Sequence, residues 1–211
     1  NIISEVSKNS GIKVRTACAD YIIDNSFFGN DFRPVRSHVN KFLACAAALG
    51  CEGVVLPFLE QSCLTKLNVD DCVDPLKELA LVASKLNLVI NIETLLEGRE
   101  LASLLDRVNS DHVKVVFDTG NRVQLTARPE EEIILLGQRI NHVHVKDKNE
   151  NGQNVLLGTG QVNFEKVFNA LHTINYKGPL VFETTRGNCP HLTGKYNKSF
   201  TEFFSKNAEK C

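Results

Sequence analysis

Short apolar runs rich in β-branched residues alternate along the chain with segments that carry apolar residues at helical spacing. This alternation is the feature that most constrains the fold. Runs of this length and composition are typical of strands, and apolar residues three and four positions apart predict the helices between them. Strands that are apolar on both faces and joined by helices form a parallel sheet covered by helices. We therefore predict an α/β fold with strands over residues 12–18, 51–58, 88–93, 113–118, 140–145 and 179–183.

The predicted helices fill the intervals between these strands. Gly50 is a stop for the first of them, Pro129 and three glutamates open the fourth, and Asn163 caps the fifth. Residues 20–34 are polar and contain glycine, asparagine and proline, which predicts a long loop. Helices are expected over residues 35–49, 69–86, 98–108, 129–139 and 163–174, with a last one from about residue 198.

A closed (β/α)8 TIM barrel is the architecture that we predict. Polar residues at the carboxyl ends of successive strands are typical of such barrels, whose active sites lie at that face. An open doubly wound sheet is the alternative, but no glycine-rich fingerprint follows the first strand. Only six strands are predicted and the chain starts at Asn1 instead of a methionine. We therefore expect residues 1–211 to be a single barrel domain that lacks its first two βα units.

Composition narrows the class of protein. With 211 residues, 43% apolar residues and a net charge of −1, the chain suits one globular domain. The charge balance argues against non-specific binding to nucleic acid or to an anionic membrane. We find no signal peptide and no apolar run of about 20 residues, the length of a membrane span. The seven cysteines form no CxxC pair, so we expect mostly reduced, buried thiols in a cytoplasmic protein.

Four strands end in side chains that can bind a metal: Glu93, Asp118, His144 and Glu183. Several hard oxygens and one imidazole nitrogen suit one divalent cation such as Mn²⁺, Mg²⁺, Co²⁺ or Zn²⁺. Such an ion can hold two adjacent oxygens of a sugar and stabilise an enediolate, while carboxylates nearby move a proton as general bases. Alternation along the strand places His142 on the same face as His144 but deeper, where we expect a hydrogen-bonded interior histidine.

Five segments carry a resemblance to a known family: NIETLLEG, VVFDTGN, INHVHVKDKN, LGTGQVNF and LVFETTRG. They resemble the xylose isomerase-like barrels, and within them the sugar phosphate isomerase/epimerase group, which includes ketose 3-epimerases, hydroxypyruvate isomerase and inosose dehydratase. The resemblance runs from about Val14 to about Phe203 and enters at the family's third strand. It implies a small carbohydrate substrate and a possible homo-oligomer. The charge balance and the lack of a long apolar run predict no nucleic-acid and no membrane partner.

The resemblance also implies roles for individual residues. Glu93, Asp118, His144 and Glu183 match the family's four metal ligands. Glu93 and Glu183 match the pair that works on opposite faces of the sugar in the ketose epimerases, where one removes the proton on carbon three and the other returns it. The chain departs from those epimerases at three positions. It has Arg99, Asn121 and Glu150 where they carry Glu, His and Arg, respectively. The resemblance therefore supports proton transfer more firmly than ketose 3-epimerisation.

Further polar residues are candidates for the substrate site. We expect Asn121, Lys146 and Arg186 to contact substrate, Lys146 through a hydroxyl or phosphate and Arg186 through a phosphate or carboxylate. Lys146 and Arg186 can equally be solvated loop residues. The amides of residues 158–160 are placed to bind a phosphate or belong to a flexible loop. We expect His191 to be a loop residue and residues 20–34 to form a lid over the barrel mouth.

Four functions remain open from the sequence. The first is a metal-dependent isomerase or epimerase of a small sugar, sugar acid or sugar phosphate, and the second is an inosose-type dehydratase using the same ion. An abasic-site DNA endonuclease is a third, but such enzymes need a three-zinc cluster with more histidines and a basic surface, whereas the chain has six histidines. The fourth is a non-catalytic barrel that only binds a sugar.

Overall fold

The computed structural model describes residues 2–28, 33–184 and 190–208, which fall into two compact units. The first unit comprises Asn1–Val116 and Leu135–Asn141, and the second comprises Phe117–Ile134 and His142–Cys211. All six predicted strands are found within the described residues, and helices separate them along the chain. The prediction of an α/β fold built from parallel strands is therefore confirmed.

The strands of the first unit pair in parallel and in chain order. β1 (Thr16–Cys18) pairs with β2 (Gly53–Phe58), β2 with β3 (Val89–Thr94), and β3 with β4 (Val113–Asp118). The last two residues of β4 belong to the second unit. The helices of the first unit are α1 (Ile2–Ser10), α2 (Tyr21–Asp24), α3 (Arg33–Ala48), the 3-10 helix η1 (Glu60–Ser62), α4 (Val69–Lys85) and α5 (Gly98–Val108).

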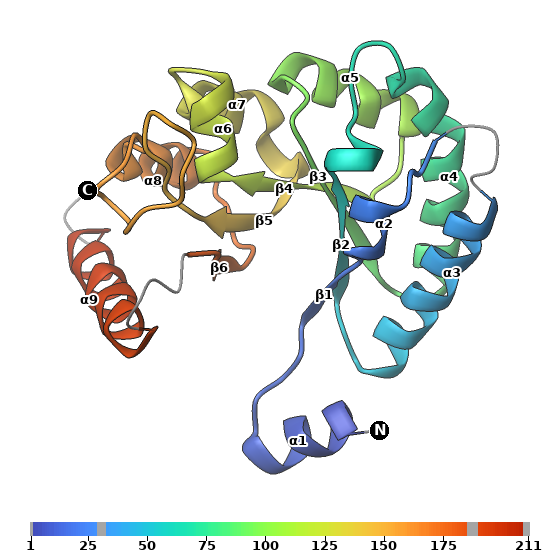
Figure 1. The fold of residues 1–211 in the computed structure, drawn as a ribbon, viewed down its shortest axis with the longest axis horizontal. Coiled ribbons are helices and arrows are strands. Elements are labelled where there is room, and N and C mark those ends of the chain that lie inside the picture. Colours follow the sequence, from blue (N-terminus) through green and yellow to red (C-terminus); the bar gives the residue numbers. More distant parts are fainter. Residues whose placement is uncertain (1, 29–32, 185–189, 209–211) are drawn as a thin grey trace. The chain divides into compact units, whose positions relative to one another are not determined.

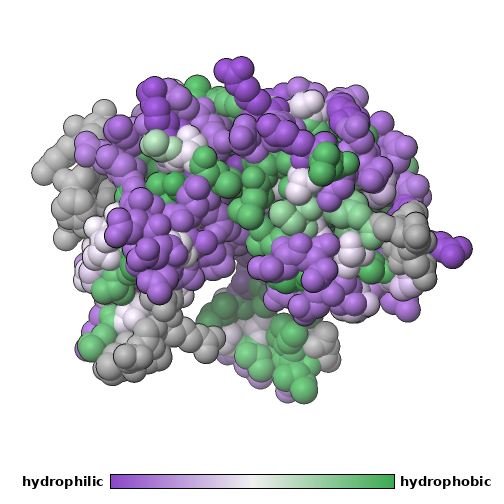
Figure 2. All heavy atoms as spheres, turned by 45° about the horizontal axis from the view of Figure 1, so that its top comes forward, coloured by the Kyte–Doolittle hydropathy of each residue, from purple (hydrophilic) through white to green (hydrophobic). Residues whose placement is uncertain are grey.

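The core of the first unit lies between its sheet and the covering helices. All six residues of β2 are buried, as expected of a strand covered on both faces. Helix α3 packs on β2 and α4 packs on β3, and α4 also contacts α5 (Figure 1). Helix α1 has no buried residue, and its Ile2 and Val6 are 79% and 59% exposed. Figure 2 shows that exposed hydrophobic residues lie among hydrophilic ones on one face of the molecule.

The second unit carries the end of the chain and most of β5 (Ile140–Val145). β5 pairs in parallel with β6 (Leu180–Phe182), with His144 opposite Val181. Its helices include α8 (Phe164–Thr173) and α9 (Pro190–Ala208), which meet through an edge-to-face contact between Phe164 and Phe200. The other elements after β4 are α6 (Thr119–Leu125), α7 (Pro129–Leu136), whose last two residues belong to the first unit, and the 3-10 helix η2 (Gly137–Arg139) in the first unit.

Several predicted boundaries are wrong. The first strand starts at Thr16 instead of residue 12, and the last helix starts at Pro190 instead of about residue 198. The predicted loop over residues 20–34 contains α2 and the start of α3. The part of this segment before residue 29 is anchored, because Phe27 is 1% exposed and its backbone N–H donates to Ser62 Oγ at 2.8 Å. Residues 29–32 of the predicted lid lie outside the described residues.

The described cysteines are all free, as predicted, but they are not mostly buried. Cys51 and Cys72 are buried, and burial raises the pKa of both thiols. Cys18 and Cys45 are exposed, which contradicts the expectation of a buried set. In the described part of the chain, we find no helix with the length and apolar character needed to span a membrane.

Candidate metal centre

Three of the four predicted metal ligands meet in the second unit: Asp118, His144 and Glu183. His144 Nδ1 lies 2.6 Å from Glu183 Oε2 and 3.7 Å from Asp118 Oδ2. Each of the three offers a ligand atom within 4.8 Å of those of the other two. Asp118 is 2% exposed, His144 12% and Glu183 47% at the side chain. The cluster is therefore buried on one side and open at Glu183.

The local structure explains why each of these side chains points where it does. Asp118 ends β4 and caps α6, because its Oδ1 accepts a hydrogen bond from Asn121 N at 2.8 Å. His144 alternates on β5 with the buried Val143 and Val145. Glu183 directly follows β6, and its backbone N–H donates to Val145 O at 3.2 Å. Pairing of β6 with β5 thus brings Glu183 beside His144.

Lys146 completes this cluster as its cation. Its Nζ lies 2.9 Å from Asp118 Oδ2 and 2.6 Å from Glu183 Oε1, and the residue is only 6% exposed. The structure therefore excludes the reading of Lys146 as a solvated loop lysine. A buried ammonium requires partners of this kind, since an unpaired one is costly to keep away from water.

These contacts keep both carboxylates ionised. Burial alone would raise the pKa of Asp118, but the nearby His144 imidazole and the charge of Lys146 outweigh it and hold that pKa at about 2. For Glu183, burial likewise raises the pKa, but the close contact with His144 and the hydrogen bond from Lys146 lower it to a net value below the ordinary one. The pKa of Lys146 is raised, because its carboxylate partners outweigh the opposing effect of burial. The three groups are therefore charged at neutral pH.

The donor set fits a divalent cation. Two ionised carboxylates and one imidazole nitrogen converge from three strand ends, and carboxylate oxygens with a single nitrogen suit Mn²⁺, Mg²⁺, Co²⁺ or Zn²⁺. The cluster among the described residues consists of carboxylates and one imidazole, without a thiol. The Asn121 N–H orients the carboxylate of Asp118, and Lys146 and His144 hold that of Glu183, so the donors are arranged before an ion binds.

The fourth predicted ligand, Glu93, lies in the first unit. It is the fifth residue of β3, pairs in register with Pro57 of β2, and is 6% exposed. The residues on either side of it, Ile92 and Thr94, are also buried. A carboxyl group in such surroundings requires a partner. That Glu93 meets the other three ligands stays a prediction.

The structure treats the remaining predicted site residues in different ways. Asn121 is partly buried in α6, where its backbone N–H donates a hydrogen bond to Asp118 Oδ1. Arg186 lies outside the described residues. His191 falls within α9 and not in a loop, which contradicts that prediction. The substrate contacts of Asn121, Lys146 and Arg186 stay predictions.

His142 is buried, as predicted, but it is not fully hydrogen-bonded. It is 3% exposed, and its Nε2 finds no hydrogen-bond partner among the described residues. Its ring meets that of His144 edge to face at a centroid distance of 4.9 Å. Burial, assisted by the charge of His144, lowers the pKa of His142 to about 4, so this imidazole is neutral at physiological pH.

The glycine-rich loop after β5 does not offer free amides to a phosphate. Asp147 Oδ2 accepts hydrogen bonds from Gly158 N at 2.9 Å and Gly160 N at 2.8 Å, and Asp147 Oδ1 accepts one from Val162 N at 3.1 Å. Asp147 is 1% exposed. Of the two alternatives for residues 158–160, the phosphate site is contradicted, because a carboxylate of the chain itself takes the place of the anion.

Sequence reasoning missed two residues that hold Lys146 in place. Thr119 Oγ1 donates to Lys146 O at 2.5 Å and accepts from Lys146 N at 2.9 Å. A Cβ atom on Gly120 would lie 2.8 Å from Lys146 Cγ and 3.1 Å from its Cδ, so the lysine stem passes directly over this glycine. The signal was present in the Asp-Thr-Gly sequence after β4, but nothing in it names Lys146 as the partner.

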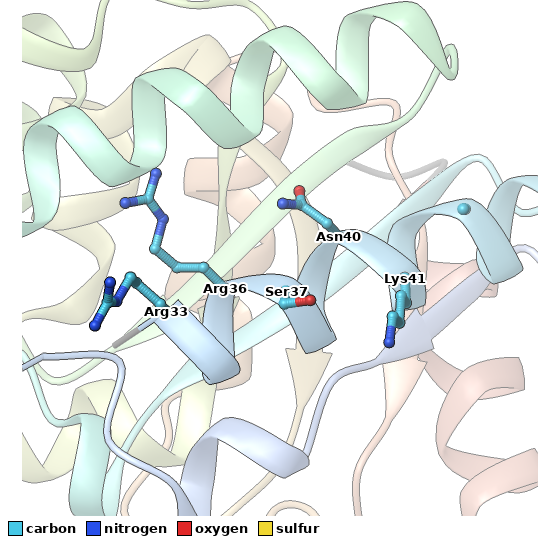
Figure 3. A pocket seen from close by; sticks show the side chains of 6 residues that line it. Arg33, Arg36, Ser37, Asn40 and Lys41 are labelled. Carbon is cyan, nitrogen blue, oxygen red and sulfur yellow. The ribbon is translucent and has the colours of Figure 1, made fainter. Parts of the chain in front are cut away.

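A shallow, open hollow of about 540 Å³ lies on α3 in the first unit. It is lined by Arg33, Arg36, Ser37, Asn40, Lys41 and Ala44 (Figure 3). Arg36 pairs with Glu78 of α4. This basic surface was not predicted, because Arg33 fell in the predicted loop and the other residues on a helix that was defined by its apolar positions alone.

The chain resembles several characterised proteins. Residues 21–203 match the family described as xylose isomerase-like TIM barrel. A D-psicose 3-epimerase of Enterocloster bolteae is 28% identical over 116 residues, covering 51% of this chain and 37% of the relative. An inosose dehydratase of Clostridium botulinum is 32% identical over 102 residues, covering 40% of this chain and 34% of the relative. The chain thus spans about a third of the length of these curated relatives.

Among solved structures, a xylose isomerase domain protein from Planctomyces limnophilus superposes with a TM-score of 0.83 at 19% identity. The match covers 99% of this chain and 82% of that protein. At this identity, the similarity shows the fold. Together with the match over residues 21–203, it identifies the strands described above as those of a TIM-barrel type of α/β fold.

Proposed function

The chain belongs to the xylose isomerase-like TIM barrel family, and from that premise we propose that it is a divalent-metal-dependent isomerase or epimerase. The substrate class is a small sugar, sugar acid or sugar phosphate. The observation that carries this proposal is the convergence of Asp118, His144 and Glu183, with one ligand atom from each within 4.8 Å of the others. The epimerase and dehydratase relatives support a sugar substrate.

Glu93 is the proposed fourth ligand. The carboxyl ends of parallel barrel strands lie at one face, and Glu93 stands near that end of β3 as Asp118 does at the end of β4. Its burial, at 6% exposure, is consistent with the role of a metal ligand. A divalent ion bound by the four residues would hold adjacent oxygens of the sugar and stabilise the negative charge of an enediolate.

Proton transfer is the proposed work of the two glutamates. Glu183 is the better defined of them, because the hydrogen bond from Lys146 and the close contact with His144 keep it ionised and fix its direction. Its side chain is also 47% exposed, which lets a substrate reach it. We place Glu93 on the opposite face of the sugar. One of the two glutamates would remove the proton, and the other would return a proton from the opposite face. Asn121, Lys146 and Arg186 are the proposed substrate contacts.

A dehydratase of the inosose type is the second candidate, supported by the relatives of that activity at 31–33% identity. The same carboxylates would remove a proton next to a carbonyl, and a hydroxyl group would then leave. The two candidates are separated by mass: epimerisation leaves the mass of the sugar unchanged, whereas dehydration lowers it by that of one water molecule.

The proposed function is tested by proton exchange. The Mn²⁺-loaded protein is incubated in heavy water with a panel of ketoses, sugar acids and their phosphates, and deuterium in the sugar is followed by NMR. We expect Glu183→Gln to slow exchange by at least about 10²-fold, because a positioned general base contributes about 10²–10⁴. The exposed Glu165 of α8 provides the matched control, Glu165→Gln. Unchanged exchange in Glu183→Gln would remove this residue from the mechanism.

A further inference from the structure

Lys146 is held more firmly than a lysine that only neutralises a carboxylate. Both of its backbone polar groups bond to the single hydroxyl of Thr119. Its stem crosses Gly120 so closely that any side chain there would collide with Cγ and Cδ. A residue fixed at its backbone, along its stem and at its ammonium has little freedom to swing out to water. The contacts of Lys146 therefore fix the position of its positive charge in the site.

The ammonium contacts the same carboxylate groups that are proposed to hold the metal. Lys146 Nζ lies 2.9 Å from Asp118 Oδ2 and 2.6 Å from Glu183 Oε1, while His144 Nδ1 approaches the other oxygen of Glu183 at 2.6 Å. Glu183 is thus divided between the lysine on Oε1 and the imidazole on Oε2. A divalent cation bound to these ligands would share them with a fixed positive charge.

The charges of the proposed site make this arrangement consequential. Glu93, Asp118 and Glu183 carry three negative charges when ionised, and a divalent cation supplies two positive ones. Lys146 supplies the third, so that the loaded site is neutral before substrate binds. An enediolate adds a negative charge at the sugar oxygens, and a neutral site with a fixed ammonium stabilises that charge better than a site with one excess carboxylate.

We propose that Lys146 is the fixed counter-charge of the metal centre, which weakens the hold of the site on its divalent cation and in exchange stabilises negative charge on the substrate. This inference rests on the proposed function. Two positive charges on shared carboxylates repel each other even at the high effective dielectric of a partly open site. Removal of the lysine charge is therefore expected to tighten metal binding and slow turnover, two effects of opposite sign.

The first arm of the test measures metal affinity without any sugar. Mn²⁺ binding is titrated calorimetrically for the wild-type protein, Lys146→Met, Lys146→Gln and Lys146→Arg. Methionine keeps an unbranched stem over Gly120, and glutamine keeps a hydrogen-bond donor for the carboxylates if methionine prevents folding. Circular dichroism reports folding. We expect the Kd for Mn²⁺ to fall at least about tenfold in the Met and Gln variants and to stay near the wild-type value in the Arg variant.

Lys148→Met is the matched control, because it removes the same charge two residues further along. It should leave the Kd for Mn²⁺ unchanged. The second arm measures deuterium exchange into the sugar at saturating Mn²⁺, where the Met and Gln variants should be at least about tenfold slower. A lysine that only supports the structure would weaken metal binding and slow exchange together, so the opposite signs separate the two roles.

Each outcome decides the proposal. Metal binding that is unchanged or weaker in the folded Met and Gln variants overturns it, as does the absence of Mn²⁺ binding in both the wild-type protein and the variants. Wild-type protein that binds Mn²⁺ but exchanges no sugar proton contradicts the proposed function. The tighter binding expected of the Met and Gln variants would still support the effect of Lys146 on the metal.

Discussion

Strands β2 and β5 have the same length and both pair in parallel, but their side chains differ in character. The six residues of β2, GVVLPF, are all buried and carry no ionisable group. β5, INHVHV, alternates buried valines with two histidines and runs directly into Lys146 and Asp147. The free energy that β2 contributes comes from excluding apolar surface from water, whereas β5 places charged groups where burial is costly.

The difference shows that one strand can combine apolar packing with the placing of polar side chains. In β5 the two uses alternate residue by residue: Val143 and Val145 are buried, and His144 between them contacts Asp118 and Glu183. The residues after the strand continue the division, because Lys146 joins the charged cluster while Asp147 binds the amides of the following loop. Substitutions on these positions should therefore separate the two uses.

Asp147 is expected to give the largest loss of stability. It follows Lys146 directly but is predicted to be structural, since its carboxylate accepts three backbone hydrogen bonds. Asp147→Ala leaves these amides without their acceptor and should cost about 3 kcal/mol or more of unfolding free energy, measured by urea denaturation. The fully exposed Asp111 is the control, and Asp111→Ala should cost less than about 0.5 kcal/mol. Equal costs in both variants would refute the structural role of Asp147.

Val54 of β2 should show a smaller and purely structural effect. It is 0% exposed, and Val54→Ala removes two buried methyl groups, which should cost about 2 kcal/mol of unfolding free energy. Leu81, 65% exposed on α4, provides the control Leu81→Ala. The Kd for Mn²⁺ should stay at the wild-type value in Val54→Ala. A changed Kd in this variant would break the separation between β2 and β5.

The smallest effect concerns Tyr176, which precedes β6 and donates its hydroxyl to Pro179 O at 2.8 Å. Burial raises the pKa of this phenol above its ordinary value of 10.0. The folded state thus holds the proton more firmly than the unfolded state, so the stabilisation is complete below pH 10 and is lost as the pH rises above it. Tyr176→Phe should lack this part of the alkaline loss of stability. Identical pH dependence of the melting temperature in both proteins would show that Tyr176 contributes nothing.

The fold was largely predictable because its signal is local. Buried parallel strands and amphipathic helices leave their period in the sequence, and β2, β3, β4 and α5 were found close to their observed ends. The short helix α6 was missed, because Thr119, Gly120 and Asn121 have the composition of a turn. It begins there because the carboxylate of Asp118 caps it. From the sequence, Asp118 was assigned to metal binding and not to helix capping.

The metal cluster was predictable only as a set of strand ends. Asp118, His144 and Glu183 were chosen by residue type and position, and the structure confirms that these three converge. Whether Lys146 was solvated or buried could not be decided, because its burial depends on Thr119 and Gly120, 27 and 26 positions away along the chain. The choice between a phosphate site and a loop at residues 158–160 could not be made for the same reason, since Asp147 binds the amides of Gly158 and Gly160.

The most direct test of the metal centre is the amount of Mn²⁺ bound per chain, measured by equilibrium dialysis and elemental analysis for the wild-type protein and for His144→Ala. The control is His172→Ala, which changes an exposed histidine in the last turn of α8. The account predicts one ion per chain in the wild-type and control proteins, and at least a tenfold loss of affinity in His144→Ala. Equal binding by His144→Ala, or no binding by the wild-type protein, would contradict it.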